Sequence, residues 1–152
     1  MSVIVVANPK GGVGKSTLAT NVAGALAKSG HAVMLGDVDR QQSSRQWLAL
    51  RAPQLPLIRS WELSHNDIVR PPKGTTHVVL DTPAGLHGKR LDAVLRITTK
   101  LLIPLQPSLF DIQATHAFLG ALRAHPRAAD IELGLVGMRV REHTRANEQL
   151  HH

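Results

Sequence analysis

The sequence predicts an α/β fold, with a doubly wound, mostly parallel sheet of about six strands and helices on both faces. Short, nearly continuous apolar runs recur at residues 3–7, 32–35 and 78–80, which is typical of parallel strands covered on both faces. Segments with helical spacing of apolar residues lie between such runs. Glycines and acids directly follow several of the runs, at the end of the strands where open α/β sheets bind ligands. With 152 residues, the chain is expected to form one domain over 1–152.

The loop at 8–17, Asn-Pro-Lys-Gly-Gly-Val-Gly-Lys-Ser-Thr, follows the first of these strands. Its glycines let the backbone N–H groups turn inward, and the next helix adds unpaired amides and the positive end of its dipole. These features predict a cradle for a polyphosphate, with Lys15 reaching the β and γ phosphates and the Ser16 hydroxyl ligating Mg²⁺. The residues expected to bind nucleotide here are Gly11, Gly12, Val13, Gly14, Lys15, Ser16 and Thr17.

The next elements follow from periodicity and turn residues. A helix is expected from Leu18 to Ser29-Gly30, where a glycine cap is typical. Its apolar face comprises Leu18, Val22, Ala25 and Leu26. The second strand is expected over 32–38, and Ser43 and Ser44 offer N-caps for a helix through 47–50. A short edge strand is expected at 57–58 and an irregular, exposed connection at 61–75.

The second half of the chain continues the alternation. Strands are expected at 78–81, 101–105 and 133–140, with helices around 91–95 and over 112–124. A last helix begins after Thr144 and would have barely two turns before the sequence stops.

Three acids are expected at the carboxyl ends of strands. Asp37 and Asp39 end the second strand, and Asp81 ends the strand at 78–81. This edge of the sheet faces the crevice where ligands bind, so the acids are candidates for chemistry and Asp81 for holding a Mg²⁺-bound water. The alternative for Asp37 and Asp39 is a helix cap or a solvated side chain.

Residues 10–16, Lys-Gly-Gly-Val-Gly-Lys-Ser, resemble the deviant Walker A motif of the ParA/MinD family of ATPases, and the small ParA-type partition ATPases most of all. The resemblance implies that Lys10 reaches across a dimer to the partner's nucleotide. The segment from Asp37 is similar to the family's Asp-x-Asp-Pro-Gln, although Arg40 replaces the proline. It implies that Asp39 orients the attacking water and that Asp37 lies near the metal. The implied catalytic residues are Lys10, Lys15 and Asp39, and the implied metal-binding residues are Ser16, Asp37 and Asp81.

The resemblance extends along nearly the whole chain. Asp81 and Gly85 match a Walker B segment, and Pro107 and Asp111 match a family segment to which only a structural role around the nucleotide is assigned. Met138-Arg139 stands where the family often has Asn-Arg, so Arg139 is retained for nucleotide binding while the base-reading amide is missing. Family members continue through a further strand and helices, which this domain is expected to lack.

The implied function is a weak, cytoplasmic, nucleoid-associated ATPase that uses ATP and Mg²⁺. It would dimerise with ATP on nonspecific DNA to position a plasmid, chromosome or protein cargo, and a ParB-like or other adaptor would stimulate hydrolysis. The net charge of +7 favours an anionic partner. The arginines that suggest a DNA-backbone patch are Arg123, Arg127, Arg139, Arg141 and Arg145.

Two other functions remain open. A synthetase of the dethiobiotin or cobyrinate type has the same fold, but it would need substrate-binding residues, and none is recognised in the sequence, although residues 61–75 are unassigned. A MinD-like membrane switch would need a basic amphipathic C-terminal helix, and 144–152 is too polar for one, so no membrane partner is expected. The absence of cysteine excludes disulfides, thiolate metal sites and iron–sulfur clusters.

Overall fold

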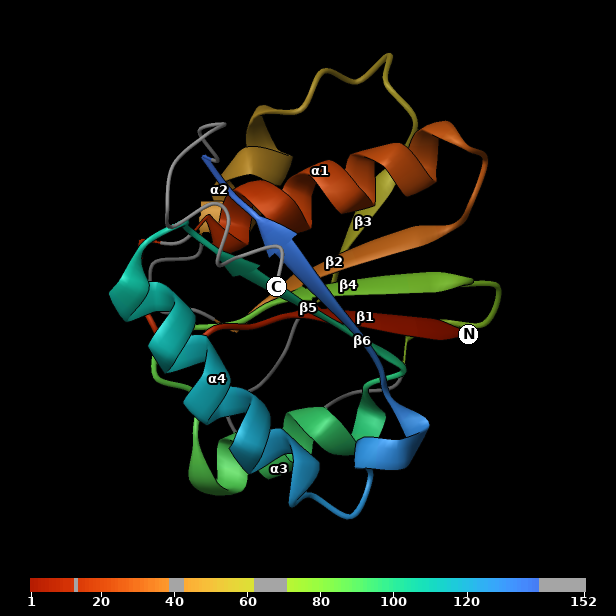
Figure 1. Cartoon of the computed structure of the whole chain (residues 1–152). Coiled ribbons are helices and arrows are strands. Elements are labelled where there is room, and N and C mark those ends of the chain that lie inside the picture. The colour runs from red at the N-terminus through yellow and green to blue at the C-terminus, as the bar shows by residue number, and fades with distance from the viewer. Residues whose placement is uncertain (13, 39–42, 62–70, 140–152) are drawn as a thin grey trace.

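The computed structural model describes residues 1–12, 14–38, 43–61 and 71–139. Within these residues, six parallel strands form one sheet in the order β3-β2-β4-β1-β5-β6 (Figure 1). The chain moves outward from β2 to β3 on one side of β1 and from β5 to β6 on the other, and β4 fills the place between β2 and β1. The predicted doubly wound sheet is therefore confirmed, and it is parallel throughout. The strands are β1 (Ser2–Val6), β2 (Val33–Asp37), β3 (Ile58–Trp61), β4 (His77–Asp81), β5 (Lys100–Leu105) and β6 (Glu132–Gly137).

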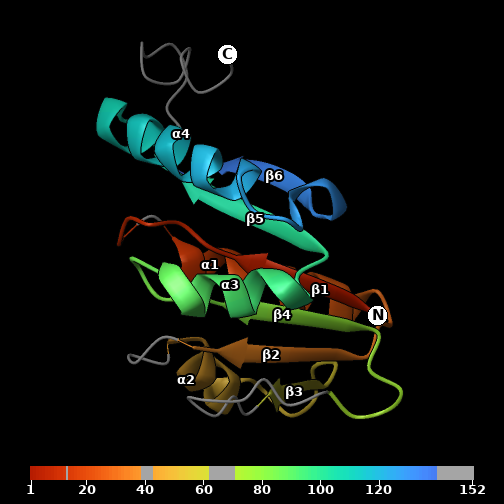
Figure 2. The same cartoon turned by 90° about the horizontal axis from the view of Figure 1, so that it is seen from below.

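Helices cover both faces of the sheet. Helices α1 (Lys15–Lys28) and α2 (Ser43–Leu50) lie on one face, and α3 (Gly88–Ile97) and α4 (Leu109–Arg123) lie on the other (Figures 1 and 2). A 3₁₀ turn, η1 (Ala128–Asp130), leads into β6. Successive residues of β1 point to opposite faces of the sheet. Val5 packs in the core that includes α3 and α4, while Val6 packs in the core that includes α1. The central strands are therefore buried on both faces, as the continuous apolar runs indicate, whereas the edge strand β6 is largely exposed.

Helix α1 starts three residues earlier than expected, at Lys15, and it faces the sheet with alanines. Ala19, Ala23 and Ala27 are buried, whereas the predicted core residue Ala25 is exposed, so that part of the prediction is wrong. The predicted leucines and valine pack at the sides of this alanine row. Because alanine has the smallest apolar side chain, the backbone of α1 lies close to the strands, which explains why alanines rather than leucines occupy the central row.

Several expected boundaries are corrected. Strand β3 continues to Trp61, which is buried although the irregular connection was expected to begin there. Strand β6 ends at Gly137 rather than at 140, and Arg139 has a left-handed φ of 52° that is incompatible with a strand. Helix α4 begins at Leu109 rather than at 112, because the Ser108 hydroxyl accepts a hydrogen bond from the Asp111 amide (3.1 Å) and caps it. The helix expected from Thr144 lies outside the described residues.

Candidate functional site

A cavity of about 910 Å³ opens at the carboxyl ends of the central strands, beside the loop between β1 and α1. Its wall combines this loop, the start of α1, the turn after β4 and the start of α3. The predicted nucleotide-binding residues on it are Gly11, Gly12, Gly14, Lys15, Ser16, Thr17 and Arg139, and Gly85 lies on it as well. The structure thus gathers these residues around one space, while Val13 and Asp39 lie outside the described residues.

The loop has the backbone that its glycines predict. Gly12 and Gly14 have φ angles of 71° and 95°, in the left-handed region that side chains disfavour. Lys15 follows in the first turn of α1, where it is buried, and its Nζ donates a hydrogen bond to the Lys10 carbonyl at 2.8 Å. An ammonium group and the amino end of a helix therefore meet under the cavity, which is the arrangement that binds phosphate.

Two of the three predicted metal-binding residues, Ser16 and Asp81, lie in contact. The Ser16 hydroxyl donates to Asp81 Oδ2 at 2.6 Å, and the Ser44 hydroxyl donates to the same oxygen at 2.8 Å. Asp81 is only 1% exposed at the end of β4. Hydroxyl and carboxylate oxygens are the hard ligands that Mg²⁺ prefers, so this set fits the ion. Ser44 was not predicted here, because its place depends on how the first turn of α2 meets β4.

Asp37 pairs in register with Asp81 on the neighbouring strand. Its Oδ2 accepts hydrogen bonds from the amides of Ser44 (2.9 Å) and Arg45 (3.4 Å), so the side chain caps α2. The cap expected from Ser44 itself is therefore wrong, since that hydroxyl donates to Asp81. The predicted role of Asp37 near a metal stays a prediction, and the capping alternative describes its contacts in this structure.

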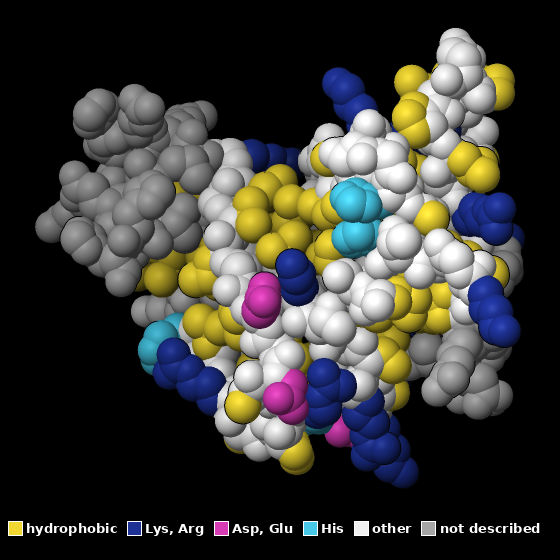
Figure 3. All heavy atoms as spheres, turned by 90° about the vertical axis from the view of Figure 1, so that its right-hand side faces the viewer, with side chains coloured by type: hydrophobic (Ala, Val, Ile, Leu, Met, Phe, Trp, Pro, Cys, Tyr) yellow, Lys and Arg dark blue, Asp and Glu magenta, His cyan; other side chains and the backbone are white. Residues whose placement is uncertain are grey.

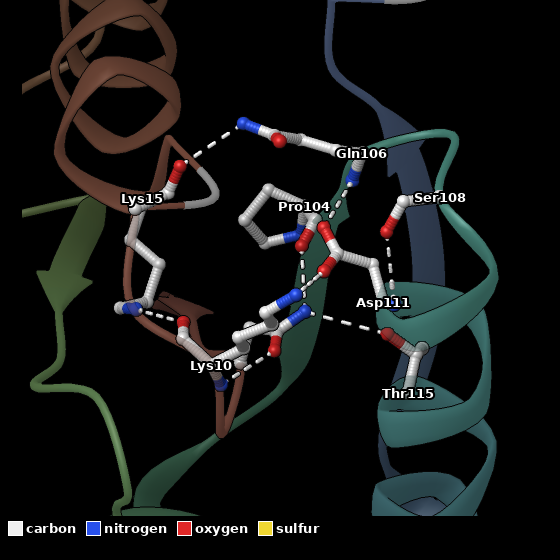
Figure 4. A network of polar contacts seen from close by, with 9 residues as sticks. Lys10, Lys15, Pro104, Gln106, Ser108, Asp111 and Thr115 are labelled. Carbon is white, nitrogen blue, oxygen red and sulfur yellow. Dashed lines mark hydrogen bonds and ion pairs between the residues drawn. The ribbon is translucent and has the colours of Figure 1, made fainter.

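Lys10 lies on the other side of the loop, where its Nζ forms an ion pair with Asp111 of α4 (Figure 4). Gln106, in the turn between β5 and α4, joins Asp111 to the loop at Gly12. Its backbone amide donates to Asp111 Oδ2 at 3.3 Å, and its side-chain amide donates to the Gly12 carbonyl at 3.0 Å. The Lys10–Asp111 and Gln106–Gly12 contacts could not be predicted from the sequence, because their partners lie 101 and 94 positions apart in the chain.

The remaining site predictions fall on the rim. The Gly85 amide donates to the Pro9 carbonyl at 3.0 Å, so it contacts the phosphate loop directly, and its predicted movement toward a γ-phosphate stays a prediction. Arg139 is exposed on the cavity wall. The neighbouring Met138 packs against the loop, since a Cβ built on Gly14 would lie 2.9 Å from Met138 Cε.

The predicted arginine patch does not form as one surface in the described part of the chain. Arg127 donates to the carbonyls of Arg96 and Thr98, before the amino end of β5, whereas Arg139 follows the carboxyl end of β6. These two arginines lie at opposite ends of the sheet because one precedes and the other follows β6. Arg141 and Arg145 lie outside the described residues.

The face at the amino ends of the strands carries Lys and Arg side chains around a pair of adjacent histidines (Figure 3). The rings of His31 and His77 lie 4.2 Å apart between centroids. Burial lowers the pKa of His77, and the nearby charges of His31, Lys100 and the N-terminus lower it further.

In the ranges that the structure describes, no helix is long and apolar enough to cross a membrane.

Comparison with known proteins agrees with this geometry. A family model described as "CobQ/CobB/MinD/ParA nucleotide binding domain" matches residues 4–150. The maintenance of carboxysome distribution protein A of Gloeobacter kilaueensis is 36% identical over 112 residues, which cover 72% of this chain and 51% of that protein. The chain spans about half the length of the curated carboxysome distribution proteins it matches.

Two solved structures share the fold. A plasmid partition protein from Borrelia burgdorferi superposes with a TM-score of 0.76 at 16% identity, over 98% of this chain and 82% of that one. The structure of pNOB8 ParA bound to nonspecific DNA gives a TM-score of 0.74 at 22% identity, over 98% of this chain and 71% of that one.

Proposed function

Because this chain belongs to the CobQ/CobB/MinD/ParA nucleotide-binding family, we propose that it is a ParA-type ATPase that positions a cargo through an ATP-dependent dimer on nonspecific DNA. The observation that carries the proposal is the presence of two lysines on one phosphate loop. Lys15 is buried under the cavity, where its ammonium group can meet a phosphate, whereas the Lys10 side chain points toward α4 and pairs with Asp111, so a different role is proposed for it.

In this proposal, different residues around the cavity bind the different parts of Mg²⁺·ATP. The loop amides and Lys15 bind the phosphates, and Ser16 and Asp81 hold Mg²⁺, with Asp37 beside them. The ion supplies positive charge to the phosphates when it is bound. Arg139, on the rim of the cavity, contacts the part of the nucleotide beyond the phosphates. Asp39 orients the attacking water.

The proposed switch has two states. Lys10 of each subunit engages the partner's nucleotide in the ATP-bound dimer, and hydrolysis, stimulated by a ParB-like or other adaptor, returns the chain to monomers. The relatives support positioning as the output, since one is named for carboxysome distribution and a structural neighbour for plasmid partition. The cargo is therefore a plasmid, a chromosome or a protein assembly, and the location is the nucleoid.

Nucleotide binding is tested by isothermal titration of ATP with Mg²⁺ into the wild type and Lys15→Ala. The variant should lose measurable binding, because it removes the ammonium group under the phosphates. Lys73→Ala, which removes an exposed lysine remote from the loop, is the matched control and should bind as the wild type does. Equal affinity in all three proteins would contradict the phosphate-loop assignment.

The dimer switch is tested by light scattering and phosphate release. Lys10→Ala should bind ATP as a monomer and lose both dimerisation and hydrolysis. Asp39→Ala should dimerise with ATP and fail to turn it over. If both variants behaved as the wild type does, the chain would share only the motif with the positioning ATPases.

DNA binding separates the positioning switch from a biosynthetic synthetase of the same fold. Fluorescence anisotropy on two unrelated duplexes should show binding with ATP, weaker binding with ADP and no preference for either sequence. Affinity should fall with salt, since each phosphate contact adds about 0.9 to the slope of log affinity against log salt. Equal binding with ATP and ADP, or none, would favour the synthetase.

A further inference from the structure

The Ser44 hydroxyl is buried behind the predicted metal site. Ser44 is 0% exposed, and its hydroxyl donates to Asp81 Oδ2 at 2.8 Å. We propose that Ser44 is a positioning residue of the metal site, which fixes the Asp81 carboxylate and couples Mg²⁺ binding to helix α2. The inference rests on the proposed function, in which Ser16 and Asp81 hold the ion.

The side chains of Ser16, Asp81 and Ser44 lie in series from the cavity inward. Ser16 lines the cavity, and its hydroxyl donates to Asp81 Oδ2 at 2.6 Å. Asp81 is 1% exposed at the end of β4, and Ser44 contacts it from the first turn of α2. An ion in the cavity can therefore meet the Ser16 hydroxyl, whereas the buried Ser44 hydroxyl holds the acid from behind. Ser44 thus acts through Asp81 and not as a ligand.

One oxygen of Asp81 accepts from both hydroxyls. A carboxylate oxygen accepts about two hydrogen bonds, so Ser16 and Ser44 together occupy Oδ2. Hydrogen bonds to an ionised acceptor are the strong ones, and donors behind a metal-binding carboxylate fix the direction in which it points. Because Ser16 also serves the ion, Ser44 is the donor whose only task at this site is to hold Asp81.

The backbone of Ser44 reaches the second acid of the site. Its amide donates to Asp37 Oδ2 at 2.9 Å, and Asp37 pairs in register with Asp81 on the neighbouring strand. The first turn of α2 is therefore attached to the carboxyl ends of both β2 and β4. An ion that draws Ser16 and Asp81 toward the cavity acts on this turn through the Ser44 hydroxyl.

This connection links the metal to the helix that follows the proposed catalytic acid. Helix α2 begins at Ser43, shortly after Asp39 in the chain. Without the Ser44 hydroxyl, the chain should still bind the phosphates through Lys15. It should gain less affinity from Mg²⁺, because contacts that orient a metal-binding carboxylate typically change metal affinity about 10–100-fold.

The first test measures the gain in ATP affinity that Mg²⁺ provides, by isothermal titration of ATP in excess Mg²⁺ and in EDTA. Ser44→Ala should bind ATP in EDTA as the wild type does, and its gain from Mg²⁺ should fall about tenfold. Ser29→Ala removes an exposed hydroxyl at the end of α1 and should leave both affinities unaltered. An unchanged gain in Ser44→Ala would overturn the positioning role. So would equal losses of affinity in EDTA and in Mg²⁺, which indicate damage to the fold.

The second test follows hydrogen–deuterium exchange of α2. In the wild type, ATP with Mg²⁺ should slow this exchange severalfold relative to ATP in EDTA, and Ser44→Ala should lose the slowing. Without nucleotide, α2 should exchange severalfold faster in Ser44→Ala than in the wild type or Ser29→Ala, because the hydroxyl attaches the helix to β4. Equal exchange in these three nucleotide-free proteins would overturn the contact, and a wild-type α2 indifferent to Mg²⁺ would overturn the coupling.

These results separate failure of the inference from failure of the proposed function. If the wild type bound no ATP, or gained nothing from Mg²⁺, the proposed ATPase would fail and the role of Ser44 would fail with it. A normal gain in the wild type and the same gain in folded Ser44→Ala would refute the inference alone. If far-UV circular dichroism shows that Ser44→Ala does not fold, Ser44→Cys replaces the hydroxyl with a weak donor of similar size and should show the same changes.

Discussion

Replacement of Gly14 by alanine should destabilise the nucleotide-free protein, whereas the same replacement at Gly24 should stabilise it. Gly14 has a φ of 95°, and a left-handed backbone costs a residue with a Cβ about 1–2 kcal/mol. The new methyl group would also lie 2.9 Å from Met138 Cε, at the flexible end of that side chain, which can move. Gly24 lies within α1 with open space around its Cβ position, so alanine fits there without strain.

Both replacements reduce the freedom of the unfolded chain equally, by about 0.4–1 kcal/mol. This contribution cancels in the difference between the two variants, which leaves the left-handed strain of about 1–2 kcal/mol. For a chain of this size, that difference corresponds to a gap in Tm of about 2–8 °C. Urea unfolding and thermal melts without nucleotide, followed by far-UV circular dichroism, measure it. Equal stability of the two variants would refute the strained loop conformation.

Two further changes test contacts outside the loop. Asp37→Ala should lower the free energy of unfolding by about 1 kcal/mol, since it removes the cap of α2, and an unchanged urea midpoint would contradict this. His77 has a pKa lowered from its ordinary 6.5, so the folded state disfavours its charged form and should lose stability as pH falls below about 6.5. His77→Gln should therefore lose less stability than the wild type between about pH 7 and pH 5 in urea titrations, and parallel losses would contradict the assignment.

The sequence alone predicts the sheet well, because each central strand is an uninterrupted apolar run that only burial on both faces explains. It also predicts a phosphate site in the loop between β1 and α1, whose glycines and lysines are adjacent in the chain, and the structure places this loop on the cavity. It does not predict that alanines form the buried row of α1, since periodicity favours the larger leucines. Ser44 and Gln106 could not be found either, because a hydroxyl or an amide contributes to the site only once distant elements place it there.

The alanine row of α1 also affects which parts of the protein can unfold locally. The row holds the helix closely against β1 and β4, the two central strands, so the phosphate loop is attached at both ends to the interior of the sheet. Amides of β1 and of the central turns of α1 should therefore exchange with solvent deuterium only through global unfolding, while loop amides exchange through local opening. Nucleotide should slow exchange in the loop directly, and it should slow exchange in the two flanking elements only by as much as it raises the stability of the whole domain.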